Sequence, residues 1–351
     1  MSDLWQYLGK TDRPIVFYGT GDGGDKIKAE LDRLGIPVAG VFASDGFVRN
    51  RTYHGMPVTS YAEAVKTFGE EMIILLVFGS SIPSVMERFF ALSAAHELYA
   101  PDVPVAGGEI FNEPFYEAHR EEIAATRALL CDEESRGVFD AVIDYRLTGK
   151  LTHLARHLSD EETVMRTVLH PHRYRVTLDL GAYNGDTALA LLDYAPNLET
   201  VIALEPDEKN FTKLCLNTAK AGKVEPHYGA AWSRREVLTF RRGGGRGIRR
   251  EGKDKTVEVM GLPPDSLLEG RTPDFIKFDV EGAEKQAIAG CEDSIRRYAP
   301  ELQVALYHRS EDLFTLPLMI HKMNPKYRFY MRRYPYVPAW DLNLFCTEEP
   351  E

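Results

Sequence analysis

Residues 177–187 read TLDLGAYNGDT, in which a strand passes through a glycine turn into a helix. Asp179 lies at the end of the expected strand, and Gly181 and Gly185 lie in the turn. Glycine lets the backbone approach a ligand closely, and the N-terminus of the following helix offers free N–H groups. This stretch therefore predicts a ligand-binding turn in a sheet of the α/β class.

The next expected strand ends in LEP and places Glu205 at the same edge of the sheet. A carboxylate at this place can accept hydrogen bonds from both hydroxyls of a ribose. The glycine turn and the acidic strand end together predict a site for an adenosine moiety. They do not separate NAD from S-adenosylmethionine (SAM).

Two further strand ends carry polar side chains. The stretch PDFIKFDVEGAEKQAIAG places Lys277, Asp279 and Glu281 at the end of one strand, and ALYHRSEDLF places His308 and Arg309 at the end of the next. Ligands of open α/β sheets collect at this edge. Asp179, Glu205, Asp279 and His308 are thus expected to meet at one edge of one sheet.

Over about residues 129–346 the chain resembles the FkbM-type SAM-dependent methyltransferases. The matching pieces are LDLGAYNGDT, LEPDEKNFTKLCLN, FIKFDVEGAEKQAIAG and LYHRSEDLF, followed by YRFYMRRY, and LLCDEESRGVFDAVIDYRLTG resembles the lead-in helices of that family. The resemblance implies a class I methyltransferase fold, which is Rossmann-like, with a seven-stranded sheet and an antiparallel C-terminal hairpin. It also implies SAM as methyl donor and a hydroxyl as acceptor.

Carried over position by position, the resemblance implies a set of cofactor contacts. The residues that would line the methionine and ribose side are Asp179, Gly181, Asn184, Gly185 and Asp186. Glu205 would hold the ribose hydroxyls. The residues that would surround the adenosine are Pro206, Asn210, Ala230 and Ala231. Asp279 and Glu281 would face the methyl group and the acceptor.

An alcohol acceptor must lose its proton as the new C–O bond forms, so a general base would help. His308 is the first candidate because its ordinary pKa lies near neutrality. Asp279 is the second candidate, or it orients the acceptor or the base. A divalent metal bound by Asp279 and neighbouring acids would be an alternative. No second carboxylate has convincing spacing, and we expect no metal.

A basic segment, FRRGGGRGIRREGKDK, covers residues 240–255. It could be a lid that recruits an acidic acceptor, such as a phosphorylated or nucleotide-linked sugar. Arg246 and Arg249 would then contact the substrate, together with Lys277 and Arg309 at the strand ends. The alternative is a solvated hairpin turn.

A second glycine turn, YGTGDGGDK, lies at residues 18–26. Gly19, Gly21 and Gly24 match G-x-G-x-x-G, and Asp45 follows about twenty residues later, as in dinucleotide-binding turns. The run GIPVAGVFASD with YHGMPV resembles the nucleotide-sugar-binding domains that precede some sugar acyltransferases. This resemblance implies a bound nucleotide-sugar or an NAD-like ligand. The alternative is a docking or dimerisation role.

Hydrophobic spacing predicts two β/α series. The first has strands at 15–18, 38–42 and 73–78 and helices at 24–34, 60–67 and 83–95. The second has strands at 176–180, 200–204, 224–227, 275–278 and 302–307 and helices at 186–194, 209–221 and 284–298, and it ends in a hairpin. We expect a smaller Rossmann-like nucleotide-binding-type domain over 1–110, helical connector and lead-in helices over 111–170, and the methyltransferase domain over 171–351.

The 351 residues carry a formal net charge of −11, which argues against general nucleic-acid binding. The four cysteines form no CxxC pair, the N-terminus has no apolar stretch of signal-peptide length, and the longest apolar run, 72–78, is too short to span a bilayer. We therefore expect a cytoplasmic protein without membrane insertion. Its partner would be a small-molecule or glycan hydroxyl acceptor.

Two competing interpretations stay open at this point. One is an NAD-linked or nucleotide-sugar-processing enzyme that acts through the N-terminal domain, although that domain lacks the Tyr-x-x-x-Lys pair of short-chain dehydrogenases. The other is a non-catalytic binding module, which the retained Asp279, Glu281 and His308 disfavour.

Overall fold

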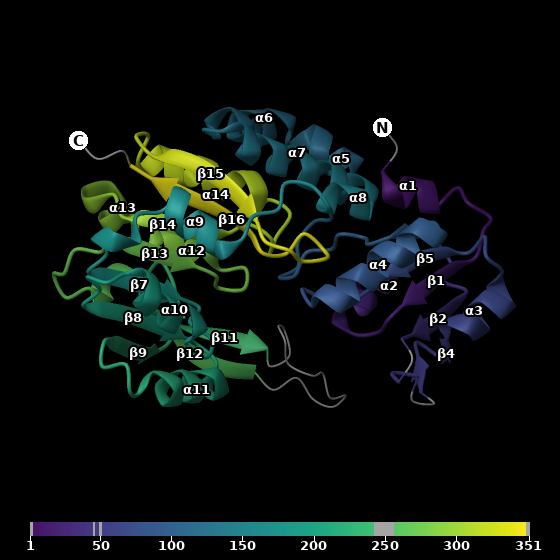
Figure 1. The fold of residues 1–351 in the computed structure, drawn as a ribbon, viewed down its shortest axis with the longest axis horizontal. Coiled ribbons are helices and arrows are strands. Elements are labelled where there is room, and N and C mark those ends of the chain that lie inside the picture. The colour runs from purple at the N-terminus through teal and green to yellow at the C-terminus, as the bar shows by residue number, and fades with distance from the viewer. Residues whose placement is uncertain (1–2, 45, 49–50, 242–255, 349–351) are drawn as a thin grey trace. The chain divides into compact units, whose positions relative to one another are not determined.

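The computed structural model describes residues 3–44, 46–48, 51–241 and 256–348 (Figure 1). The chain divides into two compact units, which we call the first and the second unit. The first unit consists of Met1–Glu121, Arg136–Leu158 and Arg333–Asp341. The second unit consists of Glu122–Ser135, Ser159–Arg332 and Leu342–Glu351. Each unit contains a sheet of its own.

The first unit has a six-stranded sheet in the order β3-β4-β2-β1-β5-β6 within the described residues. The strands are β1 (Ile15–Tyr18), β2 (Gly40–Ala43), β3 (Thr52–Tyr53), β4 (Met56–Ser60), β5 (Ile73–Leu76) and β6 (Leu98–Tyr99). All neighbouring pairs are parallel except β3 with β4. Because β1 and β5 are buried at every position, their unbroken apolar sequences suit the centre of a parallel sheet. This α/β sheet was expected from the alternation of strands and helices.

The described residues of the N-terminal part contain five helices, of which α1, α3 and α5 begin at a side-chain cap. They are α1 (Leu4–Leu8), α2 (Asp22–Arg33), α3 (Tyr61–Phe68), α4 (Pro83–Ala95) and α5 (Glu113–Ala118). Ser60 and Glu63 form a capping box at the start of α3, which ends the preceding strand at that point. The helical stretch that follows contains α6 (Arg120–Leu129), α7 (Glu133–Thr148), α8 (Leu151–Leu154) and α9 (Glu161–Thr167).

The second unit has a seven-stranded sheet in the order β15-β16-β14-β13-β7-β8-β9 (Figure 1). The strands are β7 (Val176–Leu180), β8 (Thr200–Glu205), β9 (Val224–Tyr228), β13 (Phe275–Phe278), β14 (Glu301–Ala305), β15 (Arg328–Arg333) and β16 (Leu342–Thr347). The strands from β14 through β9 run parallel, whereas β16 is antiparallel to β14. The expected seven-stranded sheet with an antiparallel C-terminal hairpin is confirmed.

Of the helices after β7, those expected at 186–194 and 209–221 are present, the one expected over 284–298 is split, and the one at 312–323 was not expected. They are α10 (Asp186–Tyr194), α11 (Glu208–Thr218), α12 (Glu284–Ala289), α13 (Glu292–Tyr298) and α14 (Asp312–Met323), with short 3-10 turns η1 (Pro171–Arg173) and η2 (Pro264–Leu267). The single helix expected over 284–298 is wrong, because it is split at Gly290 and Cys291. A Cβ on Gly290 would lie 2.2 Å from the carbonyl oxygen of Trp232. This close backbone approach accounts for glycine at the break.

The sequence did not predict a small sheet that lies between β9 and β13 along the chain. It has the order β10-β12-β11 and contains β10 (Ala230–Ala231), β11 (Glu236–Arg241) and β12 (Thr256–Leu262). The β11–β12 pair is antiparallel and the β10–β12 pair is parallel. Residues 242–255, which include most of the basic segment, lie outside the described residues.

Candidate active site

Four strand ends of the second unit meet at one edge of its sheet. The strands β14, β13, β7 and β8 are parallel neighbours, so their C-terminal ends lie side by side. Asp179 is the next-to-last residue of β7, Glu205 ends β8, Asp279 follows β13 and His308 follows β14. The sheet order therefore brings these four expected residues to a common edge, where ligands of open α/β sheets bind.

The glycine turn after β7 is pressed against the end of β13. Gly181 has φ +86°, and a Cβ at this position would lie 1.9 Å from the backbone oxygen of Asp279. Gly185 caps α10 in the left-handed conformation. The Asn184 side chain accepts a hydrogen bond from the backbone N–H of Asp186 at 3.2 Å. The turn therefore needs glycine both for its backbone shape and for its close approach to the neighbouring strand.

Glu205 is 5% exposed and is held by the backbone around it. Its Oε2 accepts a hydrogen bond from the N–H of Tyr183 at 2.9 Å, and its Oε1 accepts one from the N–H of Asp207 at 2.8 Å. Burial raises the pKa of Glu205 to about 7, although these two hydrogen bonds act in the opposite direction. A carboxylate accepts about four hydrogen bonds, so the ionised group can receive more donors.

The expected adenosine side lies next to Glu205 in the fold. Asn210 lies in the first turn of α11, where its backbone N–H donates to Asp207 Oδ1 at 3.0 Å. Its side chain lowers the pKa of Glu205 through a hydrogen bond. Pro206 is half-buried directly after β8. Ala230 and Ala231 form β10 and are both buried. The expected adenosine contacts of these residues stay predictions.

Lys277 occupies the centre of the edge between two acids. Its Nζ lies 3.5 Å from Asp179 Oδ1 and 3.8 Å from Asp279 Oδ2, and it donates to Thr187 Oγ1 at 3.0 Å. Burial lowers the pKa of this ammonium, but Asp179 and Asp279 raise it more, so the pKa lies above its usual value. The expected substrate contact of Lys277 stays a prediction. In this structure its ammonium is engaged by these protein groups.

Asp179 is fully buried behind the glycine turn. Burial raises the pKa of this carboxyl, and Lys277 opposes the shift. Neither carboxyl oxygen has a hydrogen-bond partner within the described residues. A buried carboxylate that lacks donors is costly, and a ligand carrying an ammonium group and ribose hydroxyls fits the donor deficit of this edge.

His308 is 1% exposed and lies among carboxylates. Its Nδ1 forms an ion pair with Glu284 Oε1 at 2.9 Å, and its Nε2 lies 3.7 Å from Asp279 Oδ1 and 3.6 Å from Glu281 Oε2. Burial lowers the pKa of the imidazole, but Glu284 and the other two acids outweigh it and raise the pKa to about 9. At neutral pH the ring is therefore an imidazolium, which donates hydrogen bonds and does not accept them.

Residues 179–338 match the family described as "Methyltransferase FkbM domain". These residues are an FkbM methyltransferase domain. The protein is a SAM-dependent methyltransferase, as the sequence predicted. No curated protein matches the chain.

A solved structure has the same fold as this chain. The crystal structure of the methyltransferase FkbM from Methylobacillus flagellatus KT has a TM-score of 0.71 at 19% identity and covers 95% of this chain and 89% of that chain. The fibrillarin pre-rRNA processing protein of Methanococcus jannaschii has a TM-score of 0.36 at 15% identity and covers 53% of this chain and 71% of that chain. The first likeness establishes the fold, and the second is too low to support a further conclusion.

Three residues of the FkbM domain edge were missed by the sequence interpretation. The Tyr307 hydroxyl donates to Asp279 Oδ1 at 3.1 Å, Glu284 pairs with His308, and Thr187 accepts from Lys277. Glu284 lies within the DVEGAE piece and Tyr307 directly precedes His308, so both residues could have been named as site candidates from the sequence. Their contacts cross between neighbouring strand ends, and that register could not be read from spacing alone.

The expected substrate arginines have different positions. The Nε of Arg309 donates to the backbone oxygen of Gly282 at 3.0 Å, and its N–H donates to Asp312 Oδ2 at 2.9 Å. Arg309 thus supports the turn that carries Asp279 and Glu281. Arg246 and Arg249 lie outside the described residues, and their expected contacts stay predictions.

The N-terminal glycine turn is filled by aromatic side chains of its own unit. A Cβ on Gly19, which has φ +106°, would lie 2.3 Å from the Phe78 ring, and one on Gly24 would lie 2.6 Å from the Tyr53 hydroxyl. That hydroxyl donates to Asp25 Oδ1 at 2.7 Å. Packing therefore accounts for both glycines without a ligand.

Gly21 and Asp45 are the other two residues of the expected dinucleotide-binding pattern. Gly21 has φ +121° and is the N-cap of α2, and no heavy atom of the described residues other than its chain neighbours lies within 4 Å of its would-be Cβ. Asp45 lies outside the described residues. The expected nucleotide-type ligand of this turn stays a prediction.

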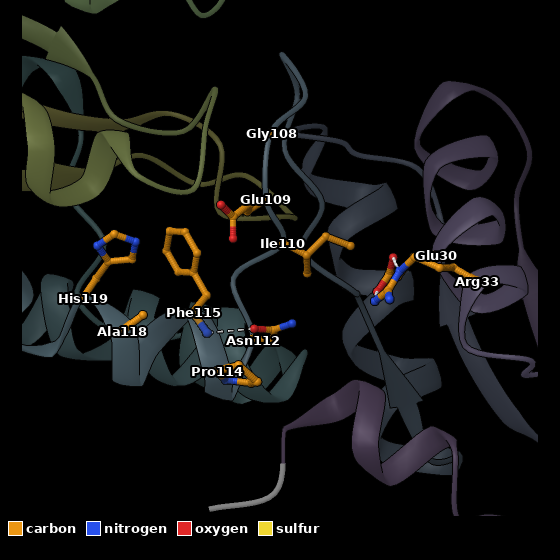
Figure 2. A pocket seen from close by; sticks show the side chains of 10 residues that line it. All are labelled: Glu30, Arg33, Gly108, Glu109, Ile110, Asn112, Pro114, Phe115, Ala118 and His119. Atoms are coloured by element: carbon orange, nitrogen blue, oxygen red, sulfur yellow. Dashed lines mark hydrogen bonds and ion pairs between the residues drawn. The ribbon is translucent and has the colours of Figure 1, made fainter.

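A surface hollow of about 460 Å³ lies in the first unit (Figure 2). Its polar lining is already paired: Glu30 bonds Arg33 at 2.8 Å, and the Asn112 side chain caps α5 by accepting from the N–H of Phe115 at 2.9 Å. None of the expected site residues lines this hollow. It gives no reason to move the active site away from the FkbM domain.

No group of three or more His, Cys, Asp or Glu side chains among the described residues is placed to hold a metal ion. No helix among those residues has the length and apolar character that crossing a bilayer requires.

Proposed function

We propose that this SAM-dependent methyltransferase methylates a hydroxyl group of a sugar, a glycan or another secondary metabolite. The observation that carries the proposal is the placement of Asp279. Its side chain is 32% exposed at the strand-end edge and accepts a hydrogen bond from Tyr307. A carboxylate that is fixed in place yet reachable from solvent suits an acceptor that must lose a proton.

The cofactor would be held by the turn after β7 and by Glu205. Ionised Glu205 would accept hydrogen bonds from the ribose hydroxyls, and Gly181 and Gly185 would let the backbone lie close to the methionine side. When bound, SAM supplies a methyl group on an activated sulfonium. Positioning of the acceptor oxygen is then the main task of the protein.

Asp279 is the residue we propose to accept the acceptor proton. His308 was the first candidate from the sequence, but as an imidazolium at neutral pH it has no free lone pair on its ring nitrogens. Asp279 lies beside it as a carboxylate that can accept. His308 instead stabilises the anionic edge on which Asp279 and Glu281 stand.

For the first unit we favour a docking or dimerisation role over nucleotide binding. The Tyr53 hydroxyl and Asp25 occupy the turn at which a pyrophosphate would lie, and Asp25 adds negative charge there. Calorimetry with NAD and UDP-sugars would detect such a ligand. Micromolar binding of either would contradict this proposal, and a strictly monomeric mass in solution would exclude the dimer.

The acceptor class can be tested with SAM that carries a labelled methyl group. The protein is offered a panel of monosaccharides, nucleotide-sugars, oligosaccharides, amines and carboxylic acids. We expect label in an O-methyl group, with the product identified by mass spectrometry and NMR. Label on nitrogen or on a carboxylate would overturn the hydroxyl proposal.

The role of Asp279 is tested with Asp279→Asn and a matched control. The variant should bind S-adenosylhomocysteine as the wild type does but transfer methyl groups at least about a hundredfold more slowly. Asp293→Asn makes the same chemical change on a side chain that is 73% exposed, and it should keep the full rate. A full rate in Asp279→Asn would exclude it as the proton acceptor.

A further inference from the structure

Glu284 is a fully buried acid at the start of α12. Its Oε1 accepts a hydrogen bond from the N–H of Val280 at 2.9 Å and a longer one from Gly282 at 3.4 Å. The same oxygen lies 2.9 Å from His308 Nδ1. One carboxyl oxygen thus meets the DVEG turn, which we define as residues 279–282, and the buried imidazole.

An ionised carboxylate without a partner is very costly in a protein interior. The second oxygen of Glu284, Oε2, has no hydrogen-bond partner within the described residues. Charge compensation therefore depends on His308, which is itself 1% exposed. The pair is closed to water, so the Glu284 carboxyl acts directly on the charge of the imidazole.

The second nitrogen of the imidazole, Nε2, lies toward the strand-end edge of the sheet. Nε2 lies within 3.7 Å of Asp279 and 3.6 Å of Glu281, which both belong to the DVEG turn. Glu281 has φ +54°, a conformation that non-glycine residues rarely adopt and that neighbouring contacts must hold. Glu284 contacts this turn directly through Val280 and indirectly through His308.

We propose that Glu284 is a positioning residue that fixes the charge and orientation of His308 and thereby holds the Asp279 carboxylate toward the acceptor. The pair is comparable to a histidine whose second nitrogen faces a buried carboxylate, here in an ion pair whose geometry is not that of a hydrogen bond. The link to catalysis rests on the proposed role of Asp279. The link between Glu284 and His308 does not depend on it.

Four carboxylates and one phenol face this imidazole region. Asp279 and Glu281 come from the end of β13, Glu284 comes from α12, Asp312 comes from α14, and Tyr307 precedes the histidine itself. Burial and Glu284 raise the pKa of Asp312 to about 7. Since Asp312 can be neutral near pH 7, Glu284 is the buried acid left to balance the imidazolium.

The test is an NMR titration of the histidine ring signals in the full-length protein. His308→Gln identifies the His308 signal by its loss. In the wild type we expect this signal to titrate near pH 9. In Glu284→Gln we expect its pKa to fall by at least one pH unit, and Glu284→Asp should restore most of the shift.

Glu292→Gln serves as the matched control. Glu292 begins α13, its side chain is 48% exposed, and it pairs with Arg296. This variant should leave the His308 titration unchanged. If His308 in the wild type titrates at or below its ordinary value, the proposal fails even where Glu284→Gln does not fold. An unchanged His308 pKa in a folded Glu284→Gln would also overturn it.

A kinetic measurement separates positioning from simple folding support. With an acceptor from the labelled-methyl panel, Glu284→Gln should lower kcat at least tenfold and leave the affinity for S-adenosylhomocysteine within twofold. An unchanged kcat would contradict the positioning role. If Asp279→Asn keeps its full rate while His308 still responds to Glu284, the proposed base fails and the Glu284–His308 coupling stands.

Discussion

Cofactor affinity should depend on pH through Glu205. Burial raises the pKa of Glu205 to about 7, so about 10% of molecules carry the carboxylate at pH 6 and about 90% at pH 8. Only the ionised form can accept hydrogen bonds from both ribose hydroxyls without giving up an oxygen to its own proton. Affinity is therefore present above pH 7 and is lost as the pH falls through 7. We expect Kd to rise about tenfold from pH 8 to pH 6.

Isothermal titration calorimetry with S-adenosylhomocysteine measures this dependence. At pH 6 the complex should release about one proton for each cofactor bound, which calorimetry in buffers of different ionisation enthalpy reports. Glu205→Gln cannot ionise, so its residual pH dependence corrects for titration of the ligand. At pH 8 this variant should bind about tenfold to a hundredfold more weakly, since a hydrogen bond to a charged group contributes about 1.5–3 kcal/mol.

Two outcomes would refute the reasoning. Wild-type affinity that stays flat from pH 6 to pH 8 would show that Glu205 does not titrate in this range. A Glu205→Gln variant with the same pH dependence as the wild type would assign the proton to another group. Glu199→Gln is the matched control, because its side chain is 54% exposed and pairs with Arg175. It should change neither the affinity nor the released protons.

Three further predictions concern the same edge. Gly181→Ala should lower the melting temperature and weaken S-adenosylhomocysteine binding more than the control Gly222→Ala does. Both glycines have positive φ, where a side chain costs about 1–2 kcal/mol. Only a Cβ on Gly181 would also clash with the end of a neighbouring strand. Asp279→Asn should bind S-adenosylhomocysteine within twofold of the wild type while methyl transfer drops at least about a hundredfold, and equal losses of both would point to misfolding. His308 has a folded pKa of about 9 above its ordinary 6.5, so its contribution is present below pH 6.5 and is lost as the pH rises through 9. Chemical denaturation should show that the unfolding free energy of the wild type falls by up to about 3 kcal/mol over this range relative to His308→Gln, and parallel curves would contradict it.

The sequence was sufficient to predict elements and site residues where one continuous segment contains both the hydrophobic pattern of the element and the functional residue. The strand β7 and the helix α10 begin and end at the expected residues, and Glu205 stands at the strand end that was assigned to it. Apolar runs set these strands, and glycine sets the turn between them. Parallel pairing then brings their ends together without further information.

Sequence was insufficient where a contact joins distant segments. The break at Gly290 depends on the backbone of Trp232, and the glycines of the N-terminal turn depend on Phe78 and Tyr53. The protonation of His308 likewise depends on Glu284, which lies on another element. Such contacts depend on tertiary packing, so residue type alone suggested His308 as a base where its surroundings make it a cation.

The two buried cations of the edge act on one carboxylate from opposite sides. Lys277 faces Asp279 Oδ2, whereas Tyr307 and His308 face Oδ1. A carboxylate held on both oxygens has little freedom to rotate, and the same cations offset the charge of the surrounding acids. The proposed cofactor turn and the proposed base are also in direct contact, because Gly181 packs on the backbone oxygen of Asp279. Movement of the turn after β7 would therefore displace Asp279, so we expect cofactor binding and acceptor positioning to be coupled.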